Sequence, residues 1–233
     1  MLELKEVTAG YGETVVLRDV TISVPDSKVV ALLGPNGAGK TTTLRTASGL
    51  IKPMGGRVLL DGQDVTGQKP YALARRGLCH LPEGHGIFPS LTVKENIVLS
   101  SPKGKEKESV EKAGDQFSAL ATRLGQLAGS LSGGEQQMLS LVRAYVTNPR
   151  IVIVDEASLG LSPLLVDQVF ETLSQVVASN TSLLIVEQYV TRALELADTV
   201  YLMNRGQIVF SGAAADLRAE DVFERYLGIE VSP

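Results

Sequence analysis

Hydrophobic and polar positions alternate in the N-terminal part of the chain. Val20, Ile22 and Val24 are separated by polar residues, which is the two-residue period of a strand that buries one face. The segment GGRVLLDGQDV, residues 55–65, carries two turn signals around an apolar run. The first sixty residues are therefore predicted to be rich in β-strands.

Short apolar runs recur through the rest of the chain, at residues 29–33, 151–154 and 183–186, and residues 78–81 are predicted to form a further short strand. Segments with helical signals lie between them. Residues 70–76 are predicted to be helical, and Ser162 and Pro163 open a second helix whose apolar residues repeat at helical spacing, namely Leu165, Val169, Leu173 and Val176. Buried strands that alternate with helices predict a parallel sheet flanked by helices.

The middle of the chain has a different pattern, because residues 84–143 show no strand signal. Thr92 and Glu95 form a capping box that opens a helix through Leu99. The charged segment 103–108, KGKEKE, is predicted to be a solvated loop or a helix start. Near the C-terminus, a hairpin-like turn follows the apolar residues 200–203, and residues 213–227 are predicted to form a helical tail.

Composition narrows the classes of protein. The chain has 233 residues, 44% of them hydrophobic, so it can bury a core. Its net charge of −4 argues against a nucleic-acid surface. No apolar run approaches the ~18 residues of a spanning helix, and the N-terminus lacks the features of a signal peptide, so a cytosolic protein is expected.

The cysteine and histidine residues give no sign of a metal site. Cys79 is the single cysteine, which excludes an internal disulfide, and we expect it to be a buried small hydrophobe. Its spacing to His80 and His85 matches no zinc pattern. Both histidines are expected on the surface or in loops.

The segment GPNGAGKT, Gly34 to Thr41, fits the pattern GxxxxGK[ST] between an apolar run and a segment that can be helical. In that context it predicts a phosphate-binding loop, because the helix start offers unpaired N–H groups and a positive dipole end. The glycines allow backbone angles and close approaches that a Cβ forbids. Lys40 is expected to reach the β and γ phosphates and the Thr41 hydroxyl to bind Mg²⁺.

Two acids, Asp155 and Glu156, follow the buried run 151–154. Ligands of α/β sheets bind beyond the carboxyl ends of the strands, so these acids are predicted to face the phosphate loop. Asp155 is expected to hold Mg²⁺, directly or through water, and Glu156 to accept a hydrogen bond from the attacking water. The alternative is that the acid pair caps the next helix.

The string LSGGEQQ, Leu131 to Gln137, has a structural reading as a capping box in which Ser132 is the N-cap and Glu135 its partner. A capping box does not need Gly133 and Gly134, and two glycines raise the cost of ordering the segment. A bulky anion that approaches the helix start closely would explain them.

This string resembles the signature sequence of the ATP-binding cassette (ABC) ATPases, and the resemblance covers essentially the whole chain. The loop at Gly34 to Thr41 is similar to that family's Walker A, and residues 151–156 to its Walker B. Tyr11 occupies the place of the adenine-stacking aromatic, with a simple turn residue as the alternative. The resemblance implies that two subunits sandwich two ATP molecules, each site completed by the other subunit's Ser132, Gly133 and Gly134. One chain would then be half an enzyme.

Within the family, the segments LPEGHGIFPSLTVKENI, LSGGEQQM, DEASLGLSPLLV and LLIVEQ resemble the ATP-binding subunits of branched-chain amino-acid importers and their relatives for urea and short amides. Glu83 and Gln188 stand where most ABC ATPases have glutamine and histidine, and the resemblance implies that both are usual in this subgroup. Gln188 can donate a hydrogen bond to a γ-phosphate but cannot exchange a proton near neutral pH. Glu83 is expected near the Mg²⁺ shell or the attacking water, or else is a surface acid at a strand end. Ala157 and Ser162 also depart from the family pattern, which puts communication between the two sites in doubt.

The sequence thus predicts an α/β fold: a P-loop ABC ATPase core with an antiparallel β subdomain (residues 1–83 and 146–233) and a helical insertion (84–145). ATP and Mg²⁺ are the expected cofactors. Glu156, Lys40 and Gln188 are the expected catalytic residues, and Thr41, Asp155 and Glu83 the expected metal ligands. The expected nucleotide-binding residues are Tyr11, Gly34, Pro35, Asn36, Gly37, Ala38, Gly39, Lys40, Thr41, Thr42, Glu83, Ser132, Gly133 and Gly134.

The resemblance implies three partners: a second ABC ATPase subunit (an identical copy or a sibling), integral membrane permease subunits and, indirectly, a solute-binding protein. The permease subunits would hold the chain at the inner face of the cell membrane. Nucleic acid is not an expected partner.

Three other classes of protein are alternatives to this assignment. The ATPase of a lipid or lipopolysaccharide exporter would share every nucleotide-site motif. Non-transport ABC proteins carry duplicated cassettes or long coiled coils, which this chain lacks. A P-loop GTPase or kinase would leave LSGGEQQ unexplained, and the chain has no NKxD motif.

Overall fold

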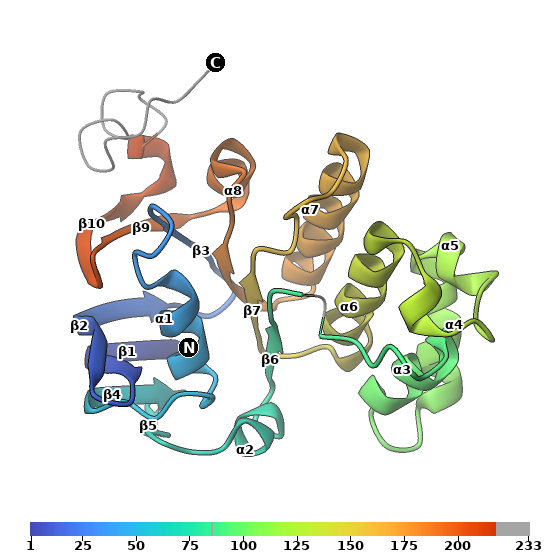
Figure 1. The fold of residues 1–233 in the computed structure, drawn as a ribbon, viewed down its shortest axis with the longest axis horizontal. Helices are drawn as coiled ribbons and strands as arrows, with labels where there is room; N and C mark the ends of the chain where they lie inside the picture. The colour runs from blue at the N-terminus through green and yellow to red at the C-terminus, as the bar shows by residue number, and fades with distance from the viewer. Residues whose placement is uncertain (85, 218–233) are drawn as a thin grey trace.

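The protein is described by a computed structural model that covers residues 1–84 and 86–217 (Figure 1). Within these residues a central sheet has the strand order β10-β9-β3-β8-β7-β6. Neighbouring strands from β9 to β6 pair in parallel, and β10 adds an antiparallel edge. Its strands are β3 (Val29–Leu33), β6 (Leu78–Leu81), β7 (Ile151–Asp155), β8 (Ser182–Val186), β9 (Thr199–Asn204) and β10 (Gln207–Ala213). The apolar runs that predicted a parallel sheet are its central strands, since strands covered on both faces need no alternation.

A second, antiparallel sheet has the order β2-β1-β4-β5. Its strands are β1 (Leu2–Tyr11), β2 (Thr14–Val24), β4 (Gly55–Leu60) and β5 (Gln63–Asp64). Val20, Ile22 and Val24 are all fully buried, while the intervening Thr21 is exposed and Ser23 is half-buried. The alternation predicted from the sequence is thereby confirmed.

Helix α1 (Lys40–Ala47) lies between the two sheets (Figure 1). Its Leu44 and Ala47 share one apolar cluster with residues of both sheets. The other face of the central sheet is covered by α7 (Pro163–Ala178) and α8 (Val190–Leu196), whose buried residues belong to a second cluster. This packing fixes α1, and the loop that precedes it, at the carboxyl end of β3.

Helices fill the chain between β6 and β7, on the right of Figure 1. They are α3 (Val93–Ser100), α4 (Glu106–Gln116), α5 (Ser118–Ala121) and α6 (Gly133–Thr147), with a 3₁₀ turn at Ala128–Ser130. Over 86–147 the strand-type pairing is the isolated bridge between Thr92 and Leu127. Thr92 caps α3 as predicted: its hydroxyl accepts from the Glu95 N–H at 3.2 Å, and its own N–H donates to Glu95 Oε2 at 2.7 Å. The charged segment 103–108 contains the start of α4.

The remaining expectations have mixed outcomes. The short helix α2 (Pro70–Ala74) and the β9–β10 hairpin confirm two of them. Cys79 is buried, which raises the pKa of its thiol to about 12. His80 was wrongly expected on the surface or in a loop, because it belongs to β6 and is partly buried. His85 lies outside the described residues.

The predicted C-terminal helix is wrong at its start. Residue Ala213 ends strand β10, and Ala214–Leu217 form a 3₁₀ turn. Residues 218–227 of that prediction lie outside the described part of the chain. Among the described helices, none is both long and apolar enough to cross a membrane.

Candidate functional site

The glycine loop at the end of β3 has the backbone that its sequence predicts. Gly37 and Gly39 have φ angles of 78° and 112°, in the left-handed region that favours glycine. Gly39 is the N-cap of α1. A Cβ on Gly34 would lie 2.2 Å from the Met203 carbonyl oxygen of β9, so this glycine is required by close packing on the neighbouring strand.

Lys40 begins α1 and is 7% exposed. Its ammonium donates hydrogen bonds to the carbonyl oxygens of Gly34, at 2.9 Å, and Pro35, at 3.1 Å. Burial lowers the pKa of Lys40, while the carboxylates of Glu156 and Asp155 act in the opposite direction. The Lys40 ammonium therefore lies against the loop that would bind a phosphate, and the carboxylates of Glu156 and Asp155 are close enough to interact with its charge.

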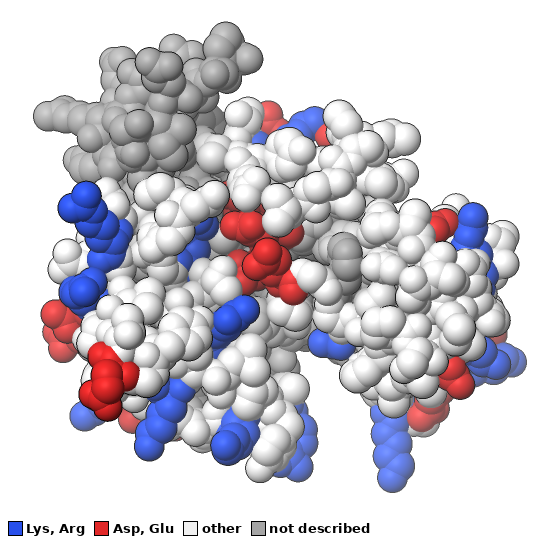
Figure 2. Space-filling view, in the orientation of Figure 1, with Lys and Arg blue, Asp and Glu red and all other residues white. Residues whose placement is uncertain are grey.

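A cavity of about 470 Å³ opens beside this loop. Five separate segments of the chain contribute to it: the β2 strand, the glycine loop with α1, and the segments that follow β6, β7 and β8. Its lining residues are Val16, Asn36, Gly37, Gly39, Lys40, Thr41, Thr42, Glu83, Glu156, Leu159 and Gln188. Figure 2 shows Asp and Glu side chains gathered near the middle of the visible face, whereas Lys and Arg lie mostly toward its edges. Sheet order has therefore brought the predicted loop, acids and glutamine to one place.

Asp155 lies behind Thr41 and is 2% exposed. The Thr41 hydroxyl donates to Asp155 Oδ1 at 3.2 Å. Burial raises the pKa of Asp155 to about 6; the Thr41 hydrogen bond lowers it, and the carboxylates of Glu156 and Glu83 add to the rise. Crowded carboxylates of this kind are stabilised in their charged form by a bound cation.

The oxygen ligands fit Mg²⁺, a hard cation that is usually held by one or two carboxylates, phosphate oxygens and water. The side chains of Thr41 and Asp155 are hydrogen-bonded to each other, and the charge of Glu83 raises the pKa of Asp155. Within the described residues no group of three or more His, Cys, Asp or Glu side chains could hold a metal by itself. The site therefore suits a cation whose shell a nucleotide completes.

Glu156 and Gln188 meet across the ends of β7 and β8. The Gln188 amide nitrogen donates to Glu156 Oε2 at 3.4 Å, and the Glu156 N–H donates to the Val186 carbonyl at 2.8 Å. Glu156 has a φ of 50°. A left-handed residue other than glycine is strained and tends to occur at functional sites, where the surrounding structure holds it in place.

Sequence reasoning missed a buried acid next to this pair. Glu187 is 3% exposed and accepts a hydrogen bond from the Ser158 N–H at 3.2 Å. The Ser158 hydroxyl donates to its other carboxyl oxygen. Burial raises the pKa of Glu187 to about 7, opposed by the Ser158 hydrogen bonds. The signal available in the sequence was an acid placed directly after the apolar run 183–186, which is predicted to be a buried strand.

Ser132 lies outside the cavity of its own chain. It caps α6 in a complete capping box, with its N–H donating to Glu135 Oε2 at 2.9 Å and its Oγ accepting from the Glu135 N–H at 3.4 Å. Ser132 and Gly133 are exposed, and a Cβ on Gly133 would meet open space. Gly134 has a different reason to be glycine: a Cβ there would lie 2.3 Å from Leu165 of α7. Close approach of an anion is therefore not needed to explain Gly134.

Three other expected nucleotide residues do not present a side chain to the cavity. Tyr11 ends β1, is 47% exposed and accepts a hydrogen bond from Arg45 Nη1 at 3.2 Å. Ala38 is buried in the cluster between the sheets, and Pro35 contributes its carbonyl to Lys40. The loop residues would contact a nucleotide through their backbone, and stacking by Tyr11 stays a prediction.

A strand, a glycine loop and a helix that meet paired acids at the carboxyl edge of a parallel sheet define a P-loop nucleotide-binding protein. The chain belongs to the ABC transporter family, whose model matches residues 17–159. The resemblance that the motifs indicated is thus confirmed.

Known relatives are similar to this chain over almost its whole length. The chain is 35% identical to "High-affinity branched-chain amino acid transport ATP-binding protein BraG" of Pseudomonas aeruginosa, over 98% of this chain and 100% of that protein. It is 34% identical to "Probable branched-chain amino acid transport ATP-binding protein LivF" of Archaeoglobus fulgidus, over 97% of each. It is also 30% identical to "Lipopolysaccharide export system ATP-binding protein LptB" of Haemophilus influenzae, over 98% of this chain and 97% of that protein.

Solved structures show the same architecture. A nucleotide-free ATP-binding cassette of an ABC transporter superimposes with a TM-score of 0.83 at 29% identity, covering 98% of this chain and 99% of that one. An ADP-bound cassette gives 0.82 at 28% identity with the same coverage. The predicted fold class is therefore confirmed, and the chain is an ABC-type ATPase, an ATP-binding subunit of a transporter. Such subunits work as dimers with membrane permease components.

Proposed function

We propose that this ATPase energises an importer of branched-chain amino acids or of related amino acids and amides. The observation that carries the proposal is full-length similarity to two branched-chain amino acid transport subunits. It is supported by a cavity lined by Glu83 and Gln188, two residues that the motif resemblance implies are usual in this subgroup. The lipopolysaccharide export subunit is the second candidate, supported by its 30% identity.

In the proposed reaction, the loop amides of residues 36–41 and Lys40 hold the phosphates of ATP. The chain would hold Mg²⁺ through Thr41, Asp155 and Glu83, and the bound cation would neutralise charge on the β and γ phosphates. Glu156 accepts a hydrogen bond from the attacking water and orients it. Gln188, already bonded to Glu156, donates its amide N–H to the γ-phosphate and leaves proton handling to Glu156.

The second half of each site comes from another ATPase subunit, either a second copy or a sibling. Ser132 and Gly133 support this, because they expose the N-terminal end of the 15-residue helix α6 to solvent. Unpaired N–H groups and the helix dipole favour a phosphate at such an end. In this scheme ATP joins the subunits and hydrolysis separates them.

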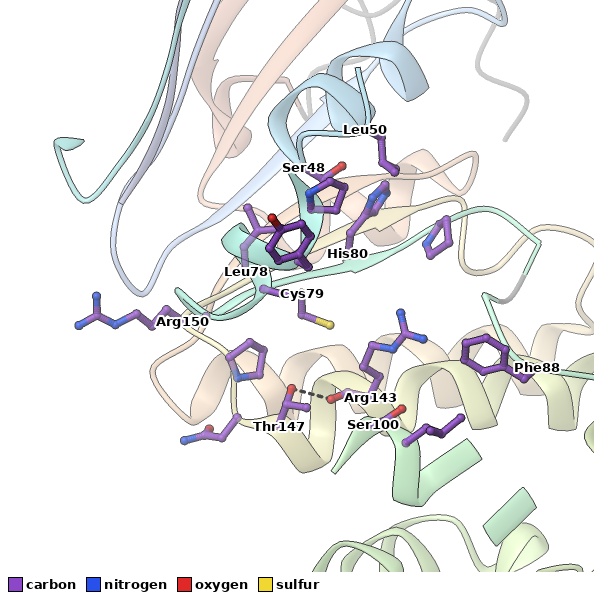
Figure 3. A pocket seen from close by; sticks show the side chains of 18 residues that line it. Ser48, Leu50, Leu78, Cys79, His80, Phe88, Ser100, Arg143, Thr147 and Arg150 are labelled. Atoms are coloured by element: carbon purple, nitrogen blue, oxygen red, sulfur yellow. Dashed lines mark hydrogen bonds between the residues drawn. The ribbon is translucent and has the colours of Figure 1, made fainter. Parts of the chain in front are cut away.

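An apolar groove of about 670 Å³ is the surface that we assign to a permease segment (Figure 3). Leu50, Tyr71, Phe88 and Leu99 line it and are each at least half exposed. These side chains come from both the α/β part and the helices between β6 and β7. A segment seated here would therefore touch both parts and respond when one moves relative to the other.

The charged side chains of the groove indicate what kind of permease segment would bind there. Arg143 lies in the groove between β6 and Phe88 in Figure 3, and no lining residue in the described chain is acidic. Arg150 also lines the groove and is ion-paired with Asp61. An apolar segment with an acidic residue, carried by the permease, matches this surface. Placed there, the ATPase would sit on the inner face of the membrane.

Leu99→Arg and Leu50→Arg are expected to reduce recovery of the permease at least about tenfold, because they place a third cation in an apolar contact region. Both residues are exposed, so ATP binding by the variant chain should not change. Recovery is measured by co-purification from detergent-solubilised membranes. Val209→Arg, an exposed apolar residue of β10 outside the groove lining, is the matched control. Undiminished recovery with both groove variants contradicts the assignment.

The importer assignment is tested by purifying the tagged chain from native membranes and identifying what accompanies it. We expect a permease together with a solute receptor that binds leucine, isoleucine, valine or a related amide in a direct binding assay. Recovery with lipopolysaccharide-export components would favour the second candidate. Recovery of a nuclease or ribosomal component would overturn a role in transport.

A further inference from the structure

Glu187 is a buried carboxyl group that the proposed reaction does not use. It follows β8, in which all five residues are buried, and is itself 3% exposed. Acidic side chains are seldom so deeply buried unless a partner holds them. The residues that hydrogen-bond to Glu187 therefore indicate its role.

Both carboxyl oxygens of Glu187 are held by Ser158. The Ser158 N–H donates to one at 3.2 Å, and the Ser158 hydroxyl donates to the other. Ser158 is fully buried. It stands between Glu156 and Leu159, two residues that line the nucleotide cavity. The pair thus attaches the loop after β7 to the end of β8.

The same loop is attached to β8 at a second point. The Glu156 N–H donates to the Val186 carbonyl at 2.8 Å, and the Gln188 side chain reaches Glu156 Oε2 at 3.4 Å. Glu156 also needs support, since its φ of 50° is strained for a residue with a Cβ. The residues before and after Glu187 therefore hold Glu156 itself, and Glu187 holds the backbone two residues further on.

The charges around Glu187 also affect the position of the loop after β7. Burial raises the pKa of Glu187 to about 7; the Ser158 hydrogen bonds and the Gln188 backbone amide lower it, and the Glu156 carboxylate raises it further. The positive charge of Lys40 also interacts with the carboxylates of Glu156 and Asp155. Ionisation of Glu187 above pH 7 therefore places a buried negative charge beside the Glu156 carboxylate, and the repulsion between the two charges favours a shift of the loop after β7.

We propose that Glu187 is a positioning residue for ATP hydrolysis, which acts through Ser158 to fix the loop that presents Glu156 and Leu159 to the nucleotide. The inference rests on the proposed catalytic role of Glu156. In this proposal, ATP turnover depends on the two hydrogen bonds between Glu187 and Ser158 and does not need a negative charge on Glu187. Glutamine can make two hydrogen bonds at the same place, because its carbonyl can accept from the Ser158 N–H and its amide can donate to the Ser158 hydroxyl.

The test compares Glu187→Ala, Glu187→Gln and Ser158→Ala in the full chain assembled with its permease. We expect Glu187→Ala and Ser158→Ala to lower kcat about tenfold with less than about a twofold change in KM for ATP, as when a catalytic group is misplaced. Glu187→Gln should restore kcat to within about twofold of the unsubstituted protein. The exposed Glu171 of α7 supplies the control Glu171→Ala, and thermal unfolding reports whether each variant is folded.

The pH profile separates positioning from simple support of the fold. The ratio of kcat for the unsubstituted protein to kcat for Glu187→Gln should fall about threefold between pH 6 and pH 8.5, because only the glutamate ionises. A pH-independent ratio overturns the proposal, as does full activity of a folded Glu187→Ala. Equal inactivity of the alanine and glutamine variants overturns it too, since the carboxylate would then be required for itself. Glu156→Gln, run in parallel, shows independently whether the catalytic assignment fails.

Discussion

Glu156→Gln is expected to lower the rate of ATP hydrolysis at least about a hundredfold, the effect of removing a general base, while ATP binding stays intact. Glutamine has the size of glutamate, and its side-chain oxygen can still accept from Gln188, which now reaches Glu156 Oε2 at 3.4 Å. It cannot accept a proton from water near neutral pH. Steady-state phosphate release measures turnover, and equilibrium binding of a fluorescent ATP analogue measures affinity.

The same substitution has a second expected outcome. Because ATP joins the subunits in the proposed cycle and hydrolysis separates them, the Glu156→Gln protein should accumulate as an ATP-dependent dimer in size-exclusion chromatography. Glu171→Gln, a substitution of an exposed glutamate on α7, should behave as the unsubstituted chain does. Retention of most of the activity by Glu156→Gln would remove Glu156 from the catalytic role, and Asp155 and Glu83 would become the acids to test.

Mixing two inactive variants is expected to restore hydrolysis. Lys40→Ala removes the ammonium beside the phosphate loop, and Ser132→Asp places a negative charge where the partner's γ-phosphate would lie. Aspartate is as good an N-cap as serine, so the second variant should keep the start of α6 folded. A mixed dimer contains one intact composite site, so an equal mixture should reach about a quarter of the normal rate if dimers form at random.

Each variant alone is expected to stay below about a hundredth of the normal rate. Ser132→Asn, which keeps a neutral cap, is the control for the charge, and it should lose less activity than Ser132→Asp. Activity of the mixture that equals only the sum of its two components would contradict a site shared between copies of this chain. A rescue obtained only with a sibling ATPase would assign the shared site to a heterodimer.

Several parts of the site could be read from the sequence because the interactions that form them are local. The left-handed angles at Gly37 and Gly39 belong to a turn of a few residues. The Ser132–Glu135 capping box joins residues three positions apart. The acid pair lies at the end of its strand, since Asp155 is the last residue of β7, and the rule that ligands bind beyond the carboxyl ends of strands is enough to predict that it lies near the loop.

Other parts were beyond the sequence because they depend on contacts between distant segments. Gly134 packs closely against the Leu165 side chain of α7, a contact that no motif records. His80 is predicted to lie on the surface or in a loop, yet it belongs to β6, where packing buries part of it. The groove beneath the helices likewise exists only once α2, β6, α3 and α6 are assembled.

The sequence by itself determined the chemistry of this protein: a phosphate loop, a lysine, two acids and a capped helix, each encoded by spacings of a few residues. The tertiary structure decided which of these groups meet. Glu156 and Gln188 are 32 positions apart, and Ser158 and Glu187 are 29 apart, and both pairs form because β7 and β8 are neighbours in the sheet. The physical reason is that hydrogen bonds within a turn follow from local backbone geometry, whereas pairing across parallel strands follows from how the whole core packs.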